Sequence, residues 1–228
     1  ILDLDADVTF SSDIGQTISL ATIEVGGATT FSEEVTSTSI KYDADVIATF
    51  TKAVNAAVTT TTDGDGTYTT AAAYTHTGQI GTAAKKLKLV NHAVGNSTFD
   101  GTIYADGVSV AGTTTLTMGA DDDIIAPVNF AADGLMVLTD GADITGNMTN
   151  TSDNHGTLTV NGASTINGLM GVVGGQDIKV LAVAATNGIV TLTDNTNIIN
   201  TNIAAAGQVK FVDTTNNAIT TEGNFNVT

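Results

Sequence analysis

Aspartates grouped beside glycines are the residues of this chain whose types and spacing best suit binding chemistry. They form a run, Asp121, Asp122 and Asp123, and a pair, Asp63 and Asp65, within the sequence DGDGT. Oxygen ligands on tight turns suit a hard cation, so these five residues are candidate calcium ligands. The downstream glutamate of a calcium loop is missing, however, and the glycine-rich nonapeptide of calcium-binding β-rolls does not repeat. The alternative interpretation is that these aspartates end turns and keep the surface soluble.

Histidine and serine spacing gives no sign of a catalytic centre. His76, His92 and His155 stand apart, without the HExxH spacing of a zinc site, and no serine lies in a GxSxG turn. The enzymatic alternative is a β-helix that binds or cleaves a glycan with carboxylates on one face. Acidic glycans call for arginine, which is absent, and neutral glycans call for aromatic platforms, yet aromatic residues make up only 5%. We therefore expect no enzyme activity and no cofactor other than calcium.

The charge balance excludes several classes of partner. Seven lysines face 24 acidic residues, which gives a net charge of −17. Nucleic acids and anionic lipids require clustered cations, so neither is expected as a partner. The cluster Lys85, Lys86 and Lys88 is too small for that role, and we expect it to lie in a solvated turn or strand edge.

The composition predicts a soluble β protein held together without covalent links. Cysteine is absent, so stability must come from packing. No stretch approaches the roughly 18 apolar residues of a membrane helix, and the first residues lack the positive start of a signal peptide. We expect a mature soluble chain or an excised segment that does not insert into a membrane.

A short repeat organises the whole sequence. Val or Thr, any residue, and then Phe or Leu return at intervals that are often roughly 20 residues, which is about one coil of a β-solenoid. Asn-Gly and Asp-Gly pairs between these runs supply tight turns. The pattern predicts that the repeated large residues are buried at equivalent places in successive coils: Phe10, Phe31, Phe99, Phe130, Leu158, Leu192 and Phe211.

The fold expected is all-β, a single right-handed parallel β-solenoid (β-helix) of about 10–11 coils over residues 1–228. The alternative is a β-sandwich subunit joined to its neighbours by strand donation. Two segments depart from the repeat. Residues 45–58 fit either a helix, from the four-residue spacing of Val46, Phe50, Val54 and Val58, or a strand. Residues 59–82 contain few large apolar residues, which predicts an inserted loop or hairpin.

The later part of the chain resembles a known family. HGTLTVNGASTINGLMG at 155–171 and NGIVTLTDNTNIINTNIAAAGQVKFVDTTNN at 187–217 resemble the passenger domains of Gram-negative autotransporter adhesins, in particular rickettsial-type outer-membrane surface antigens. The resemblance implies export through the outer membrane and display at the cell surface as a right-handed β-helix. It implies no catalytic residues, because the matched stretches contain none.

These observations together predict a structural, non-catalytic bacterial extracellular surface protein. It is either a self-associating surface-layer or filament subunit or an adhesin segment, with copies of itself, a host molecule or a glycan as partner. The strand-like residues 1–10 and 223–228 suggest head-to-tail pairing, which salt should favour by screening the negative charge.

Overall fold

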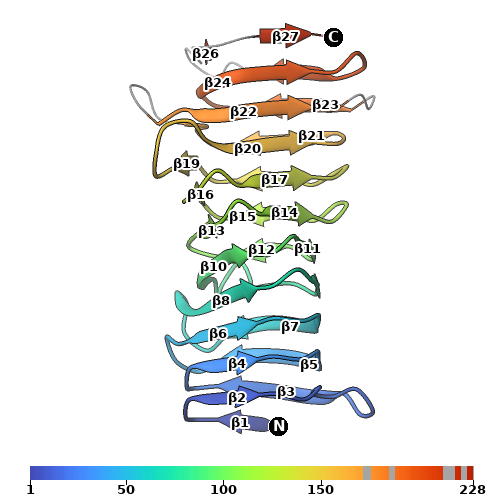
Figure 1. Ribbon diagram of the computed structural model, residues 1–228, viewed down its shortest axis with the longest axis vertical. Coiled ribbons are helices and arrows are strands. Elements are labelled where there is room, and N and C mark those ends of the chain that lie inside the picture. Colours follow the sequence, from blue (N-terminus) through green and yellow to red (C-terminus); the bar gives the residue numbers. More distant parts are fainter. Residues whose placement is uncertain (172–175, 185–187, 213–218, 222–224, 228) are drawn as a thin grey trace.

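The computed structural model is a rod of stacked parallel β-strands, with the N-terminus at one end and the C-terminus at the other (Figure 1). It describes residues 1–228 except 172–175, 185–187, 213–218, 222–224 and 228. Within the described residues every regular element is a strand, and the chain winds through a β-solenoid of about ten coils. The predicted β-solenoid is confirmed. A strand-donating sandwich is excluded, because all the strands paired in the described part of the chain run parallel.

In the residues that the structure describes, three parallel sheets form the sides of the rod. The first has 13 strands: β1 (Leu2–Leu4), β3 (Leu20–Val25), β5 (Val35–Tyr42), β7 (Val54–Thr60), β9 (Thr75–Thr77), β11 (Ser97–Asp100), β14 (Thr115–Met118), β17 (Leu135–Leu138), β20 (His155–Val160), β22 (Ile178–Val183), β24 (Thr196–Ile203), β26 (Ile219–Thr221) and β27 (Phe225–Val227).

The second sheet has eight strands: β2 (Val8–Phe10), β4 (Thr29–Phe31), β6 (Ile47–Phe50), β8 (Asp65–Ala71), β10 (Leu87–Val94), β13 (Val108–Val110), β16 (Val128–Phe130) and β19 (Met148–Asn150). The third has six: β12 (Ile103–Tyr104), β15 (Ile124–Ile125), β18 (Ile144–Thr145), β21 (Ser164–Asn167), β23 (Ile189–Leu192) and β25 (Gln208–Phe211). Coil length varies, from 17 residues between Glu24 and Lys41 to 26 between Asn167 and Thr193.

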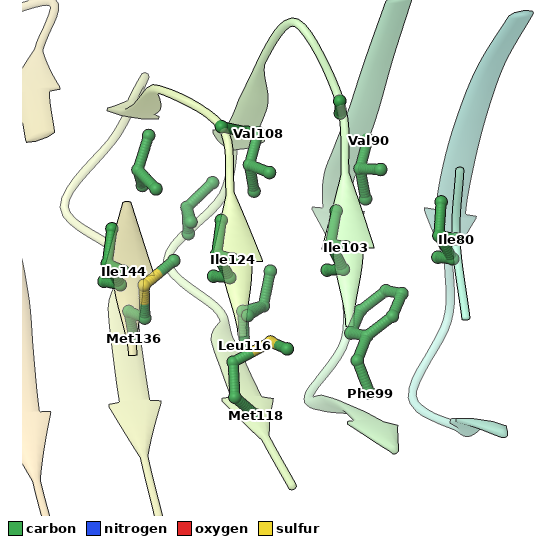
Figure 2. Close-up of a cluster of buried hydrophobic side chains, with 14 of the residues drawn as sticks. Ile80, Val90, Phe99, Ile103, Val108, Leu116, Met118, Ile124, Met136 and Ile144 are labelled. Carbon is green, nitrogen blue, oxygen red and sulfur yellow. The ribbon is translucent and has the colours of Figure 1, made fainter. Parts of the chain in front are cut away.

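The core consists of ladders of inward-facing side chains that continue from coil to coil. Alternate residues of each strand face inward, as the two-residue period of a strand requires. One ladder runs almost the length of the rod, and part of it appears in Figure 2: Leu2, Ile23, Ile40, Val58, Ile80, Ile103, Ile124, Ile144, Ile166, Leu192 and Phe211. Each coil therefore buries the apolar face of its neighbours, and isolated coils have no core of their own.

The first coils stack aromatic rings on one another. The ring centroids of Phe10 and Phe31 lie 5.5 Å apart, those of Phe31 and Phe50 lie 4.9 Å apart, and those of Phe50 and Tyr68 lie 4.5 Å apart. Such pairs contribute about 0.5–1.5 kcal/mol each beyond their buried area. Parallel in-register pairing places Phe10, Phe31 and Phe50 directly above one another. Tyr68 joins the stack from a neighbouring position, since its partner in β6 is Ala48.

The predicted core residues are mostly buried, but they do not all occupy equivalent places: Phe10 is paired with Phe31 and Leu192 with Phe211, whereas the set as a whole is divided among the sheets. Phe31, Phe99, Phe130, Leu158 and Leu192 are at most 1% exposed. By contrast, Phe10 is half-buried and Phe211 is 37% exposed. The residues belong to all three sheets: Phe31 to the eight-stranded one, Phe99 to the 13-stranded one and Leu192 to the six-stranded one. The prediction that these residues mark one position in each coil was wrong. Each side of a coil carries the same alternating pattern, so the motif returns more than once per coil.

Both exceptional segments of the sequence are ordinary parts of the solenoid. Residues 45–58 form β6 and most of β7, which settles the helix-or-strand alternative in favour of strand. The inserted loop or hairpin predicted at 59–82 is wrong. This segment contains β8, paired with β6 and β10, and β9, paired with β7 and β11. It lacks large apolar residues because Tyr68, Thr70 and His76 occupy buried positions there.

Glycine is required where a corner of one coil touches the corner beneath it. Gly146 has φ +149°, and a Cβ at this position would lie 2.2 Å from the Ala126 carbonyl oxygen. We expect Gly146→Ala to reduce the free energy of unfolding by about 1–3 kcal/mol, because a left-handed backbone and a backbone contact are both strained. Gly107→Ala is the matched control, since its nearest contact would be 3.6 Å from the Leu89 side chain. Urea unfolding of both variants tests this, and equal midpoints would contradict it.

Candidate functional site

The aspartate and asparagine side chains at the corners of the rod connect one coil to the next. Each accepts a hydrogen bond from a backbone N–H about one coil further along the chain. The pairs are Asp7 with Ala28, Asp13 with Glu34, Asp63 with Lys86, Asn96 with Thr115, Asp123 with Asp143, Asp140 with Ala163, Asp143 with Thr165 and Asn147 with Leu169. The bonds satisfy backbone donors at corners where strand pairing is interrupted.

The candidate calcium ligands divide between two places in this arrangement. Asp63 and Asp65 lie at the start of β8, whereas Asp121, Asp122 and Asp123 lie between β14 and β15. Asp63 and Asp123 each accept a backbone N–H, at 2.7 and 3.1 Å. Among the described residues, no group of three or more histidine or acidic side chains is placed to hold a metal ion.

Asp122 has the most distinctive electrostatics of this acidic run. Partial burial raises its pKa, and the negative charge of Asp100 raises it further. The carboxylates of both residues lie around Gly119, where an added Cβ would fall 2.6 Å from Asp122 Oδ2 and 2.7 Å from Asp100 Oδ1. The negative charges at this corner lie close together, and a bound cation would offset their repulsion. Calcium binding here stays a prediction.

Chelation tests the calcium prediction directly. We expect EDTA to leave the melting temperature unchanged, because Asp63 and Asp123 each accept a backbone N–H and, among the described residues, neither belongs to a group of three or more possible metal ligands. A cation bound only by the folded state would add stability by mass action, which a chelator would remove. A lower melting temperature in EDTA that added calcium restores would show that one of these corners binds the ion.

A hydrogen-bonded network of aromatic residues lies inside the coils where the sequence predicted a loop. His76 is fully buried; its Nε2 lies 2.9 Å from the Gly78 carbonyl and its Nδ1 lies 3.0 Å from the Tyr68 hydroxyl. A carbonyl only accepts, so Nε2 carries the proton and Nδ1 accepts from Tyr68. The Tyr74 hydroxyl donates in turn to that of Tyr68 at 3.1 Å. The network fixes the orientation of each of these polar groups in the core.

Burial sets the protonation state of this network. It lowers the pKa of His76 to about 4 and raises the pKa values of Tyr68 and Tyr74, so all three are neutral near pH 7. His92, also buried, lies 2.9 Å through Nδ1 from the Thr70 hydroxyl, and burial lowers its pKa as well. Spacing along the chain could not have revealed this cluster. The sequence feature that marks this cluster is the polar composition of residues 59–82, which we interpreted as a sign of a loop.

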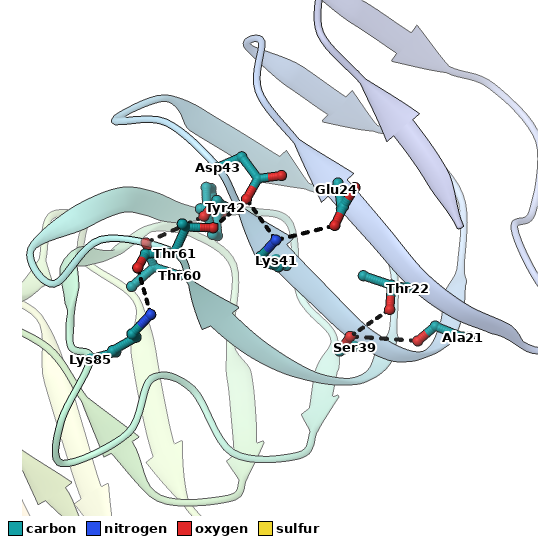
Figure 3. A network of polar contacts seen from close by, with 10 residues as sticks. All are labelled: Ala21, Thr22, Glu24, Ser39, Lys41, Tyr42, Asp43, Thr60, Thr61 and Lys85. Carbon is teal, nitrogen blue, oxygen red and sulfur yellow. Dashed lines mark hydrogen bonds and ion pairs between the residues drawn. The ribbon is translucent and has the colours of Figure 1, made fainter.

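The lysines make contacts between coils as well. Lys41 pairs with Glu24 at 3.1 Å and with Asp43 at 2.9 Å, and Lys85 donates to the Thr61 carbonyl at 2.6 Å (Figure 3). Lys88 pairs with Asp45. Lys85 lies at the turn before β10, as expected, whereas Lys88 lies within β10, which is paired on both sides.

The outer faces of the sheets contain shallow hollows. One, of about 460 Å³, lies on the eight-stranded sheet over Thr9, Thr30 and Thr49 and is bordered by Asp7 and Ile47. Another, of about 500 Å³, lies on the 13-stranded sheet over Thr159, Ala182 and Asn202. Neither contains a histidine, and the first contains a single carboxylate.

Comparison with known proteins assigns no family to this chain. No protein-family model, no curated protein and no solved structure matches it. The described part of the chain contains no helix long and apolar enough to cross a membrane.

Proposed function

We propose that this chain is a non-catalytic structural segment of a bacterial extracellular surface layer, filament or adhesin, and that it associates with copies of itself. The observation that carries the proposal is how the chemically capable side chains are used. The carboxylates of Asp63, Asp123 and Asp143 hold backbone N–H groups of the next coil. Both ring nitrogens of His76 are bonded inside the core. These groups stabilise the coils and their stacking, and they do not converge on one site.

The shape of the molecule also suits a structural role. About ten coils at a spacing of about 4.8 Å give a rod roughly 50 Å long. Such a rod is long for its number of residues, and it repeats one kind of contact along its length. The resemblance of 155–171 and 187–217 to autotransporter passenger domains supports the placement at a bacterial surface.

The first coil supplies the geometry for end-to-end pairing. The Val8 N–H donates to the Ala28 carbonyl, and the Phe10 carbonyl accepts from the Ser32 N–H, so both residues face β4. Successive residues of a parallel strand direct their backbone groups to opposite sides. The backbone N–H and C=O of Thr9 therefore point to the outer edge of β2. A strand from a second copy would pair with this edge as β4 pairs with the other.

Thr9→Pro tests end-to-end pairing with little disturbance of the folded body. Proline removes the N–H that faces outward, so we expect the variant to remain folded and lose salt-promoted assembly. Deletion of Ile1 to Phe10 should have the same effect. Thr30→Pro is the matched control: β4 is paired on both sides, so proline there should lower the melting temperature. Light scattering from 50 mM to 500 mM salt measures assembly, and wild-type protein that stays monomeric throughout would contradict the proposal.

A further inference from the structure

The outer face of the eight-stranded sheet carries a continuous rank of small, uncharged side chains and a second, interrupted rank beside it, here together called the neutral face. The first rank is Thr9, Thr30, Thr49, Thr69, Asn91, Ser109, Asn129 and Thr149. The second rank, two residues beyond each member of the first, is Ser11, Ser32, Thr51, Ala71, Ala93, Ala111, Ala131 and Thr151. Most of its members follow the end of their strand, and a register shift between β8 and β10 pairs Ala71 with Val94. All of them are exposed or half-buried.

The neutral face carries little net charge: within its strands the acidic Asp65 is balanced by the basic Lys88, and Asp7 borders its first strand. The six-stranded side carries Asp123 and Asp143, and the first coils of the 13-stranded side carry Asp3, Glu24 and Lys41. The whole chain has a net charge of −17, so copies repel one another over most of their surface. Contact through the neutral face places none of these charges directly opposite a like charge.

The spacing of the ranks restricts which partner can match them. Each rank repeats once per coil, at the distance between neighbouring strands, about 4.8 Å. A second copy of this chain has the same spacing by construction, so its side chains fit between those of the first at every coil. Small side chains also allow two sheets to approach closely and interdigitate, as they do in stacked β assemblies.

We propose that the neutral face is a lateral interface between two copies of this chain. Eight strands at about 4.8 Å, over a width of roughly three residues, bury on the order of 400 Å² on each copy, or about 800 Å² in total. Stable complexes bury about 1,200–2,000 Å², so a single lateral contact is weak. Many copies held at one surface raise the effective concentration at which such a contact forms. The inference rests on the proposed function, because it names where self-associating copies meet.

Paired lysine variants test the interface. Thr69 and Asn91 are directly paired at the middle of the neutral face, in β8 and β10. Thr69→Lys together with Asn91→Lys places four cations at the contact of two copies, and we expect dimerisation to be lost. The matched control is Thr145→Lys together with Asn167→Lys, another directly paired Thr and Asn, on the six-stranded side. Sedimentation velocity at increasing protein concentration measures dimerisation, and thermal melts establish that both variants fold.

Cysteine cross-linking gives a second readout that captures weak contacts. The chain contains no cysteine, so Thr69→Cys introduces a single thiol. We expect disulfide-linked dimers of this variant under mild oxidation, and few from the control Thr145→Cys. All lateral tests are done both with and without Thr9→Pro, because Thr9 is the terminal member of the first rank; the comparison distinguishes loss of end-to-end pairing from loss of the lateral contact.

The outcomes separate the lateral interface from other uses of the face. Dimers that the neutral-face lysines abolish and the control lysines leave intact support the proposal. Equal dimerisation of both lysine variants, or equal cross-linking from Thr69→Cys and Thr145→Cys, would overturn it. Monomeric protein that is retained on a neutral polysaccharide, with retention lost only in the Thr69→Lys and Asn91→Lys variant, would also overturn it and assign the face to a glycan.

Discussion

Replacing Phe99 with alanine is expected to lower the free energy of unfolding by about 3–5 kcal/mol. Phe99 is fully buried, and its ring centroid lies 6.1 Å from that of Tyr68 and 5.7 Å from that of His76. Truncation removes these contacts and leaves a cavity at the middle of the rod, between His76 below and Met118 above. Chemical denaturation with a two-state fit measures the loss.

Phe211→Ala is the control for this prediction. Phe211 has the same side chain but is 37% exposed, so we expect its truncation to cost less than about 1 kcal/mol. A Phe99→Ala variant as stable as Phe211→Ala would show that the core around His76 is not packed as described.

Acidification is expected to destabilise the folded chain through His76. Burial lowers its pKa in the folded state to about 4, below the ordinary value of 6.5 that it has when unfolded. The unfolded state therefore binds more protons between these values, so stability is complete above about pH 6.5 and falls as the pH drops. At 1.36 kcal/mol per pH unit, the 1.5 units from 6.5 down to pH 5 correspond to a loss of about 2 kcal/mol.

Urea unfolding at pH 8 and at pH 5 measures this effect, and a histidine variant assigns it. His76→Gln should be less stable than wild type at pH 8, because it disturbs the bonds to Tyr68 and Gly78, but its stability should change less towards pH 5. Equal pH dependence of wild type and His76→Gln would contradict the assigned cause.

The parallel solenoid was predictable because its signal is periodic and repeated. Alternation within runs such as Thr157 to Val160, and the return of large residues after each turn, specify strands that must stack. The position of a residue within a coil was less predictable. Three sides share one two-residue period, so Phe99 and Phe130 look equivalent in sequence, although they lie on different sheets.

The polar features of the structure depend on contacts that sequence spacing does not contain. The sequence presented His76 as an isolated histidine, yet stacking brings it beside Tyr68 and Phe99. The aspartates were identified as turn residues, which agrees with their place at the corners. Their backbone partners, 20 or more residues away for Asp63, Asp123 and Asp143, follow only from the register of the coils.

The hydrogen bonds at the corners give the rod a direction. In each of them the accepting side chain belongs to the earlier coil and the donating N–H to the later one, as in Asp7 with Ala28 and Asp140 with Ala163. A coil that has already formed thus presents ready acceptors to the residues that follow it. Winding from Ile1 towards the C-terminus therefore meets side-chain acceptors at these corners, whereas winding in the opposite sense meets backbone N–H donors.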